Sequence, residues 1–169
     1  MKNLILTNDP SFTAWGYVVL TPEGVIVDQG CIKTEPEHKK KHIYVADDRV
    51  RRAREIVKTL LDIIRKYDIK LIISELPHGS QNAQAAVMIG AVMALLVAVA
   101  ECLNIPAEFY NESDAKKTLL NKKSASKEEV IDAIDKIYNV KWSDTKYFNE
   151  AIADALAIHN LAKETSQLL

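Results

Sequence analysis

The fold is decided by the opening stretch LILTNDPSFTAWGYVVLTPEGVIV, residues 4–27. It contains three short runs of aliphatic, aromatic and β-branched residues, at 4–7, 16–20 and 25–27. Runs of this length bounded by turn residues are typical of β-strands. The turn signal Pro22-Glu23-Gly24 separates the last two runs, so we expect these two strands to form a hairpin. The stretch therefore predicts a sheet that opens with a three-strand meander.

Further along the chain, strand patterns alternate with helical ones, which predicts a mixed sheet. Ser126 and Glu129 have the spacing of a capping box, and Ser113 is a candidate cap for the preceding helix. We expect strands at 71–73 and 106–110, and helices at 44–67, 84–100, 113–120, 126–138 and 146–164. The sequence thus predicts a single α/β domain, residues 1–169, with a mixed five-stranded sheet and helices on both faces.

The composition is that of an ordinary globular protein, with 48% hydrophobic and 27% charged residues and a formal net charge of −1. Any affinity for DNA must therefore come from a local basic surface or from bound metal ions. Cys31 and Cys102 lie in apolar stretches and are interpreted as reduced core thiols, which fits a cytoplasmic protein. The apolar run from Ala83 to Ala100 is rich in Ala and Gly, and we expect a buried core helix here rather than a membrane span.

Three acidic residues occupy positions in apolar surroundings, where burying a charged carboxylate costs free energy. Asp9 directly follows the first strand, Glu75 directly follows the buried strand, and Asp154 lies within the apolar face of the last helix. Glu150 precedes Asp154 by one helical turn. Each residue alone has a simpler explanation, such as a turn cap, a strand-end ion pair or a solvated helix position. Acids in apolar settings are rarely buried unless they are paired or bound to metal, so together they predict a metal site.

Carboxylate oxygens in an open arrangement suit Mg²⁺, for which Mn²⁺ can substitute. Metal ions held in this way can activate a water molecule and stabilise the leaving oxygen of a phosphodiester. This chemistry needs carboxylates that converge from different elements, which two strand ends and one helix face can supply. The sequence therefore predicts a metal-dependent nuclease.

Five segments, in this order along the chain, resemble the RuvC family of Holliday junction resolvases, which has an RNase H-like fold. The resemblance spans nearly the whole chain, including a loop after Glu75 similar to phage-type relatives. The matching segments are ILTNDPSFTAWGY (5–17), IISE (72–75), ELPHGSQ (75–81), AKK (115–117) with KKSASKEEV (122–130), and ADALAI (153–158).

The resemblance implies a homodimer that binds a four-way DNA junction, each subunit making one symmetric nick with Mg²⁺. It also implies that Asp9, Glu75 and Asp154 are metal ligands and catalytic residues. Lys127 is the residue expected to stabilise charge in the transition state, as a cation near the scissile phosphate. The other lysines expected near the DNA are Lys116, Lys117 and Lys123.

Two positions depart from the family pattern. The family has a fourth acid, or a histidine, three residues before the last Asp, where this chain has Ala151. Glu150 is close to the same helix face, and we expect it to serve as the fourth catalytic acid and metal ligand. Asn8 stands where an aliphatic residue is usual, and it could tune the site beside Asp9.

The densest basic stretch includes Arg51 and Arg52, which we interpret as candidate DNA contacts, with a solvated helix face as the alternative. Ala86, Gly90 and Ala94 are small residues spaced by four, which permits close packing of another helix. That helix could belong to a partner subunit, as the family implies, or to the same chain. No membrane association is expected.

Two other functions compete with the nuclease. The first is a catalytically weak or inactive protein of the same fold that binds junctions or other branched DNA, which the alanine at position 151 suggests. The second is an ATP-binding protein of the actin-like group. The latter needs glycine-rich phosphate loops, and a chain with five glycines and no such motif does not fit it.

Overall fold

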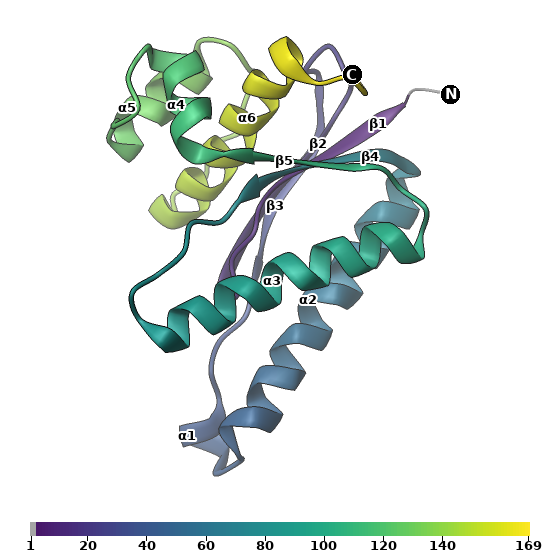
Figure 1. Ribbon diagram of the computed structural model, residues 1–169, viewed down its shortest axis with the longest axis vertical. Helices are drawn as coiled ribbons and strands as arrows, with labels where there is room; N and C mark the ends of the chain where they lie inside the picture. The colour runs from purple at the N-terminus through teal and green to yellow at the C-terminus, as the bar shows by residue number, and fades with distance from the viewer. Residues whose placement is uncertain (1–2) are drawn as a thin grey trace.

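The computed structural model describes residues 3–169 and places five strands in one mixed sheet, in the order β3-β2-β1-β4-β5 (Figure 1). Strand β1 pairs with β2 antiparallel and with β4 parallel, while β5 extends the sheet parallel to β4. The elements in chain order are β1 Leu4–Asp9, β2 Ala14–Leu20, β3 Ile26–Lys33, α1 His38–Lys41, α2 Val45–Tyr67, β4 Ile69–Leu76, α3 Ala83–Cys102, β5 Ala107–Asn111, α4 Glu112–Leu120, α5 Lys127–Asp135 and α6 Lys146–Thr165. The predicted mixed five-stranded α/β fold is confirmed.

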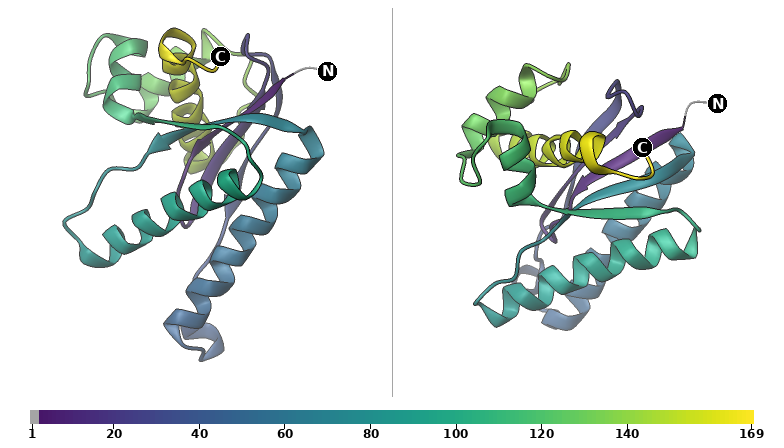
Figure 2. Two further views of the ribbon diagram at one scale, coloured as in Figure 1. Left: turned by 45° about the vertical axis from the view of Figure 1, so that its right-hand side comes forward. Right: turned by 45° about the horizontal axis from the view of Figure 1, so that its top comes forward.

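Helices cover both faces of the sheet, also as predicted. Helix α6 crosses one face together with α4 and α5, while α2 and α3 lie on the other (Figure 2). Successive residues of a strand point to opposite faces, and this alternation decides which core each joins. In β1, Ile5 packs in the core beneath α6, whereas Leu6 packs in the core beneath α2 and α3.

Helix α6 lies unusually close to the sheet because Gly16 has no side chain. A Cβ atom added at Gly16 would stand 2.5 Å from the carbonyl oxygen of Ala151 and 2.7 Å from its Cβ. The Thr7 hydroxyl donates a 2.8 Å hydrogen bond to the carbonyl oxygen of Ala155, which holds the same helix over β1. The two contacts fix the position of α6 above the strands that carry Asp9 and its neighbours.

Several local predictions need adjustment. The capping box of Ser126 and Glu129 is confirmed at the start of α5. The proposed cap at Ser113 is wrong, because α4 already begins at Glu112 and its N-cap position is Asn111. The third strand spans Ile26–Lys33 and so continues beyond the run at 25–27 that predicted it, and the short helix α1 was not predicted.

The prediction of a buried core helix at Ala83–Ala100 is wrong in its burial. Helix α3 is present, but only Val92, Leu96, Val99 and Ala100 are buried, since one side faces the sheet and the other faces outward. Within residues 3–169 it is the one helix long and apolar enough to cross a membrane, a property that core helices also show. Cys102, at its end, is exposed rather than a core thiol, while Cys31 is partly buried.

The close approach at Gly16 can be tested by substitution. Gly16→Ala should lower the free energy of unfolding by about 1–3 kcal/mol, because the added methyl group meets backbone that cannot yield without moving α6. Gly79→Ala is the matched control, since nothing lies within 4 Å of its added Cβ. Urea denaturation should show a change within about 0.5 kcal/mol for the control. Equal stability of the two variants would mean that α6 is not held at this distance.

Candidate functional site

The ends of the parallel strands bring two of the predicted acids together. Asn8 of β1 lies opposite Ser74 of β4, so the following residues, Asp9 and Glu75, are neighbours at the same edge of the sheet. Residues two apart on a strand point to the same face of the sheet. Asp9 is two residues after Thr7, whose hydroxyl contacts α6, and Glu75 is two residues after Ile73, which packs in the core beneath α6. Both carboxylates therefore lie on the face that α6 covers.

Helix α6 supplies the third acid to this face. The residues around Asp154 are apolar and buried against the sheet, and the Asp154 side chain is itself only 6% exposed. Lys127, the first residue of α5, hydrogen-bonds to the Asp154 carboxylate through its ammonium group. The structure thus assembles Asp9, Glu75, Asp154 and Lys127, residues far apart in the sequence, into one cluster.

Glu112 is a fourth acid at this cluster, and the sequence analysis missed it. It directly follows β5, the third parallel strand, and begins α4. Its Oε1 atom lies 2.5 Å from Nζ of Lys116 and 3.7 Å from Nζ of Lys127, and its Oε2 atom lies 3.7 Å from Nε2 of His78. The available signal was an acid at the end of a parallel strand, the same position that singled out Asp9 and Glu75.

The carboxylates perturb one another strongly. Burial, followed by the negative charge of Asp154, raises the pKa of Asp9 to about 7. Burial, followed by the charges of Asp9 and Asp154, raises the pKa of Glu75 to about 9. The pKa of Asp154 is also raised by burial, although the ammonium group of Lys127 opposes the shift. Such a site favours the binding of positive charge, whether protons or cations.

The pKa values of Glu112 and Lys127 shift in the directions that keep both side chains charged. Burial acts to raise the pKa of Glu112, but the hydrogen bond and charge of Lys116 lower it overall. Burial acts to lower the pKa of Lys127, but the charges of Asp154, Glu112 and Asp9 raise it overall. Glu112 and Lys127 are therefore ionised at neutral pH, whereas the raised pKa values of Asp9 and Glu75 favour their protonated forms.

The donor set fits a hard divalent cation, since Asp9, Glu75 and Asp154 offer carboxylate oxygens and are short of compensating charge. In their present rotamers, no three acidic, imidazole or thiol groups among residues 3–169 lie close enough together to enclose an ion. The Lys127 ammonium group is hydrogen-bonded to Asp154, and it also interacts electrostatically with Glu112 and Asp9. Metal binding would require this ion pair to open.

The structure places the two departures from the family pattern in different surroundings. Ala151 packs on Gly16, the residue paired with Asp9 in the sheet, so this position lies beside the cluster but carries only a methyl group. Oε1 of Glu150 lies 3.9 Å from Nζ of Lys146, the first residue of α6. The charges that shift the pKa of Asp9 are those of Asp154, Lys127 and Glu112, and Glu150 is not among them. Asn8 points to the opposite face and accepts a 3.1 Å hydrogen bond from the Trp15 indole.

The predicted basic residues divide into two groups. Lys117 lies on α4 and Lys123 in the segment that follows it, and both are exposed, while Lys116 is bound to Glu112. Arg52 is only 8% exposed, and its guanidinium donates hydrogen bonds to Thr34 Oγ1 and to the carbonyl oxygen of Phe12. Arg51 forms ion pairs with Asp48 and Glu55 on its own helix. These arginines therefore act first as structural cross-links, which sequence spacing did not reveal.

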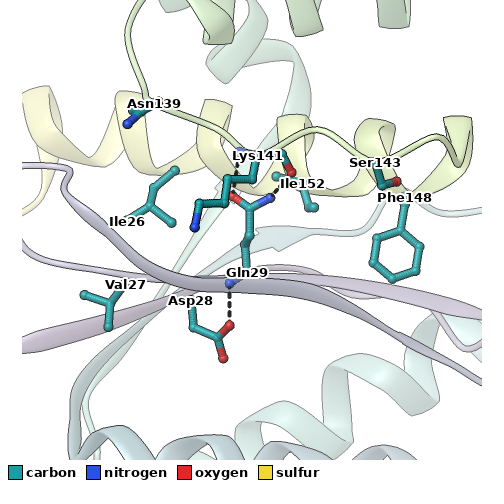
Figure 3. Close-up of a pocket in the computed structure, with 9 residues that line it drawn as sticks. All are labelled: Ile26, Val27, Asp28, Gln29, Asn139, Lys141, Ser143, Phe148 and Ile152. Carbon is teal, nitrogen blue, oxygen red and sulfur yellow. Dashed lines mark hydrogen bonds between the residues drawn. The ribbon is translucent and has the colours of Figure 1, made fainter.

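A hollow of about 400 Å³ lies elsewhere, between the edge strand β3 and the segment that leads into α6 (Figure 3). The Gln29 side chain crosses it and donates a 2.7 Å hydrogen bond to the carbonyl oxygen of Lys141. Asp28 is the only acid among its lining residues, which are Ile26, Val27, Asp28, Gln29, Asn139, Lys141, Ser143, Phe148 and Ile152. None of the acids of the cluster, Asp9, Glu75, Glu112 and Asp154, lines this hollow.

Comparisons with known proteins identify relatives across nearly the full chain. Residues 5–160 match the family model described as crossover junction endodeoxyribonuclease RuvC. A protein of that name from Ehrlichia chaffeensis is 26% identical over 165 residues, covering 98% of this chain and 99% of its own. A second one, from Protochlamydia amoebophila, is 27% identical over 158 residues, covering 92% of this chain and 87% of its own.

Solved structures show the same fold. The Thermus thermophilus RuvC in complex with Holliday junction substrate aligns with a TM-score of 0.73 at 20% identity, covering 94% of this chain and 91% of that one. The yeast mitochondrial Holliday junction resolvase Ydc2 aligns with a TM-score of 0.61 at 14% identity, covering 94% of this chain and 77% of that one.

The charge imbalance predicts a pH-dependent stability. Because the native pKa values of Asp9 and Glu75 lie above those of an unfolded chain, the native state binds more protons, and stability is lost as the pH rises toward about 7 and about 9. Asp9→Asn should therefore stabilise the protein at pH 8 in the presence of a chelator, by on the order of 1–3 kcal/mol.

Urea denaturation at pH 6 and pH 8 measures this effect, and the gain should be smaller at pH 6. Asp144→Asn, which removes an exposed carboxylate, is the control and should change little at either pH. A loss of stability in Asp9→Asn at pH 8 would contradict the electrostatic description of the cluster.

Proposed function

The chain belongs to the RuvC family of crossover junction endodeoxyribonucleases, and on that premise we propose that it makes symmetric nicks in four-way DNA junctions by metal-assisted phosphodiester hydrolysis. The observation that carries the proposal is the convergence of Asp9, Glu75 and Asp154 beside the ammonium group of Lys127. Four-way junctions arise in DNA recombination and repair, and we place this activity in the bacterial cytoplasm.

The choice of substrate is supported by the relatives. The T. thermophilus RuvC structure contains a Holliday junction, and the yeast relative is named a Holliday junction resolvase. This chain shares their fold, and the family match spans residues 5–160, the range in which Asp9, Glu75 and Asp154 lie. We therefore assign branched DNA, and the four-way junction in particular, as the substrate.

The cofactor we propose is Mg²⁺, with Mn²⁺ able to substitute, held by Asp9, Glu75 and Asp154. When bound, the metal would lower the pKa of a water molecule and polarise the scissile phosphate. The protein's own contribution is orientation. Asp9 and Glu75 are fixed by the sheet register, and Asp154 is fixed by the packing of α6 on Gly16. Lys127 supplies a mobile positive charge that can neutralise the developing phosphorane oxygens.

The proposed DNA surface surrounds this cluster. Lys117 and Lys123 are exposed, and neither forms an ion pair with the described residues 3–169. Their ammonium groups can therefore contact phosphates that flank the scissile bond. Lys116 is less exposed and is held against Glu112, beside the acidic cluster. Binding through such contacts should weaken as the salt concentration rises, because neutralised phosphates release counterions. Arg51 and Arg52 are left out of this surface because their guanidinium groups already have partners within the chain.

We also propose that the protein works as a homodimer through α3. The outward side of this helix is a stripe of exposed small and aliphatic residues with spacings of four and three, the pattern of a helix–helix seam. The stripe consists of Ala83, Val87, Gly90, Ala94 and Val97. Beside it, an apolar groove of about 400 Å³ between α2 and α3 includes Val57, Leu61 and Leu95. A second copy of the chain offers the same stripe, so a two-fold contact would bury both.

Nuclease activity is tested by cleavage of a labelled synthetic four-way junction with Mg²⁺ and with Mn²⁺. The wild-type protein should make paired symmetric nicks and should leave a linear duplex of the same sequence intact. Asp9→Asn should reduce the rate at least about a hundredfold, because metal stabilisation of the transition state is worth several kcal/mol. Tight junction binding without cleavage in either metal would instead identify a catalytically inactive DNA-binding relative.

The dimer is tested by introducing a charge into the α3 stripe. Val87→Glu should shift the protein toward monomer, weakening association by roughly tenfold or more, because a carboxylate would be buried without a partner. Val25→Glu is the matched control, because Val25 is 61% exposed and Val87 is 59% exposed. Val25 lies in the turn between β2 and β3, away from α3. Sedimentation equilibrium gives the association constant of each variant. A wild-type monomer, or equal dimerisation by both variants, would rule out this interface.

A further inference from the structure

Lys127 lies between two carboxylates. Its ammonium group hydrogen-bonds to Oδ2 of Asp154 and lies 3.7 Å from Oε1 of Glu112. The same Glu112 oxygen accepts a 2.5 Å hydrogen bond from Lys116. The contacts form a continuous chain from Asp154 through Lys127 and Glu112 to Lys116, in which Glu112 is the one carboxylate that contacts both lysines.

This arrangement conflicts with metal binding as it stands. Oδ2 of Asp154 holds the Lys127 ammonium group, and a divalent cation bound to the same carboxylate would repel the lysine. Asp154 is 6% exposed and held by a packed helix, whereas the Lys127 side chain is 40% exposed. Because one partner is fixed and the other is on a flexible stem, Lys127 is the group that moves.

Glu112 is the nearest acceptor for the displaced ammonium group. It remains ionised, because Lys116 lowers the pKa of its carboxyl group overall although burial opposes this. As the first residue of α4, it also lies at the positive end of a helix of nine residues, which favours an anion. From 3.7 Å, a change in the Lys127 side-chain torsions is enough to bring the two groups into hydrogen-bond contact.

We propose that Glu112 is a positioning residue, which receives the ammonium group of Lys127 when Asp154 becomes a metal ligand and holds it beside the scissile phosphate. This inference rests on the metal-dependent function proposed above. It gives Glu112 a role that differs from that of a fourth metal ligand in place of Ala151. In the positioning role, the effect of Glu112 on metal binding depends on Lys127, while a direct ligand acts whether or not Lys127 is present.

A double-mutant cycle with Mn²⁺ separates these roles. The variants are Glu112→Gln, Lys127→Met and the combination, titrated with Mn²⁺ by calorimetry in the absence of DNA. Glu112→Gln alone should weaken Mn²⁺ binding roughly tenfold or more, because Lys127 then stays on Asp154 and competes with the metal. Lys127→Met should tighten binding, and in its background Glu112→Gln should cost less than about threefold.

Two further variants complete the experiment. Asp114→Asn removes a carboxylate from the same helix as Glu112, at an exposed position where Asp114 accepts a 3.3 Å hydrogen bond from Asn111, and should leave Mn²⁺ affinity near that of the wild type. Glu112→Ala repeats the cycle in case the glutamine variant does not fold.

The outcomes are distinct. An equal loss of Mn²⁺ affinity from Glu112→Gln with and without Lys127 would overturn the positioning role in favour of direct coordination. No loss in either background would overturn any role for Glu112 in metal binding. If Asp9→Asn binds Mn²⁺ as well as the wild type, the metal site itself is wrong, and both this inference and the proposed function fail.

Discussion

Asp9 and Glu75 lie side by side because the strands that carry them run parallel and end at the same edge of the sheet. The α6 helix then closes over this edge and adds Asp154, so three carboxylates share a poorly solvated position. Like charges so placed cannot all ionise without compensation, and protons, the Lys127 ammonium group or a metal ion are the available sources. The other features of the site follow from this need for positive charge.

Compensation explains why residues far apart in the sequence meet here. Lys127 is placed at the first turn of α5 by the capping box of Ser126 and Glu129, and its side chain reaches Asp154 from there. Gly16 lets α6 approach closely enough to bring Asp154 over the sheet, at a position where Ala151 has no carboxylate to offer. Glu112 adds an ionised acid at the end of β5 and is held between Lys116 and Lys127. The site is thus a balance between four acids and two lysines.

Much of this was predictable from local pattern. The meander, the alternation of helices and strands, and the acids Asp9, Glu75 and Asp154 were all evident from residues in unfavourable surroundings. What the sequence pattern could not show was which neighbours a side chain would meet. Arg52 was predicted to contact DNA, but its guanidinium group is hydrogen-bonded to Phe12 and Thr34. Helix α3 was predicted to be a buried core helix, because its apolar composition does not show that only one side of it packs on the protein. Glu112 was overlooked although it stands just after a predicted strand, and the structure adds that this strand ends beside Lys127.

The most direct test of the account is a crystal structure of the protein soaked in Mn²⁺, with an anomalous difference map. The account predicts an anomalous peak coordinated by Asp9, Glu75 and Asp154, with the Lys127 ammonium group withdrawn from Asp154 and in contact with Glu112. Anomalous density at some other position, with the ion pair between Lys127 and Asp154 intact, would contradict the claim that these strand ends and α6 form a metal site.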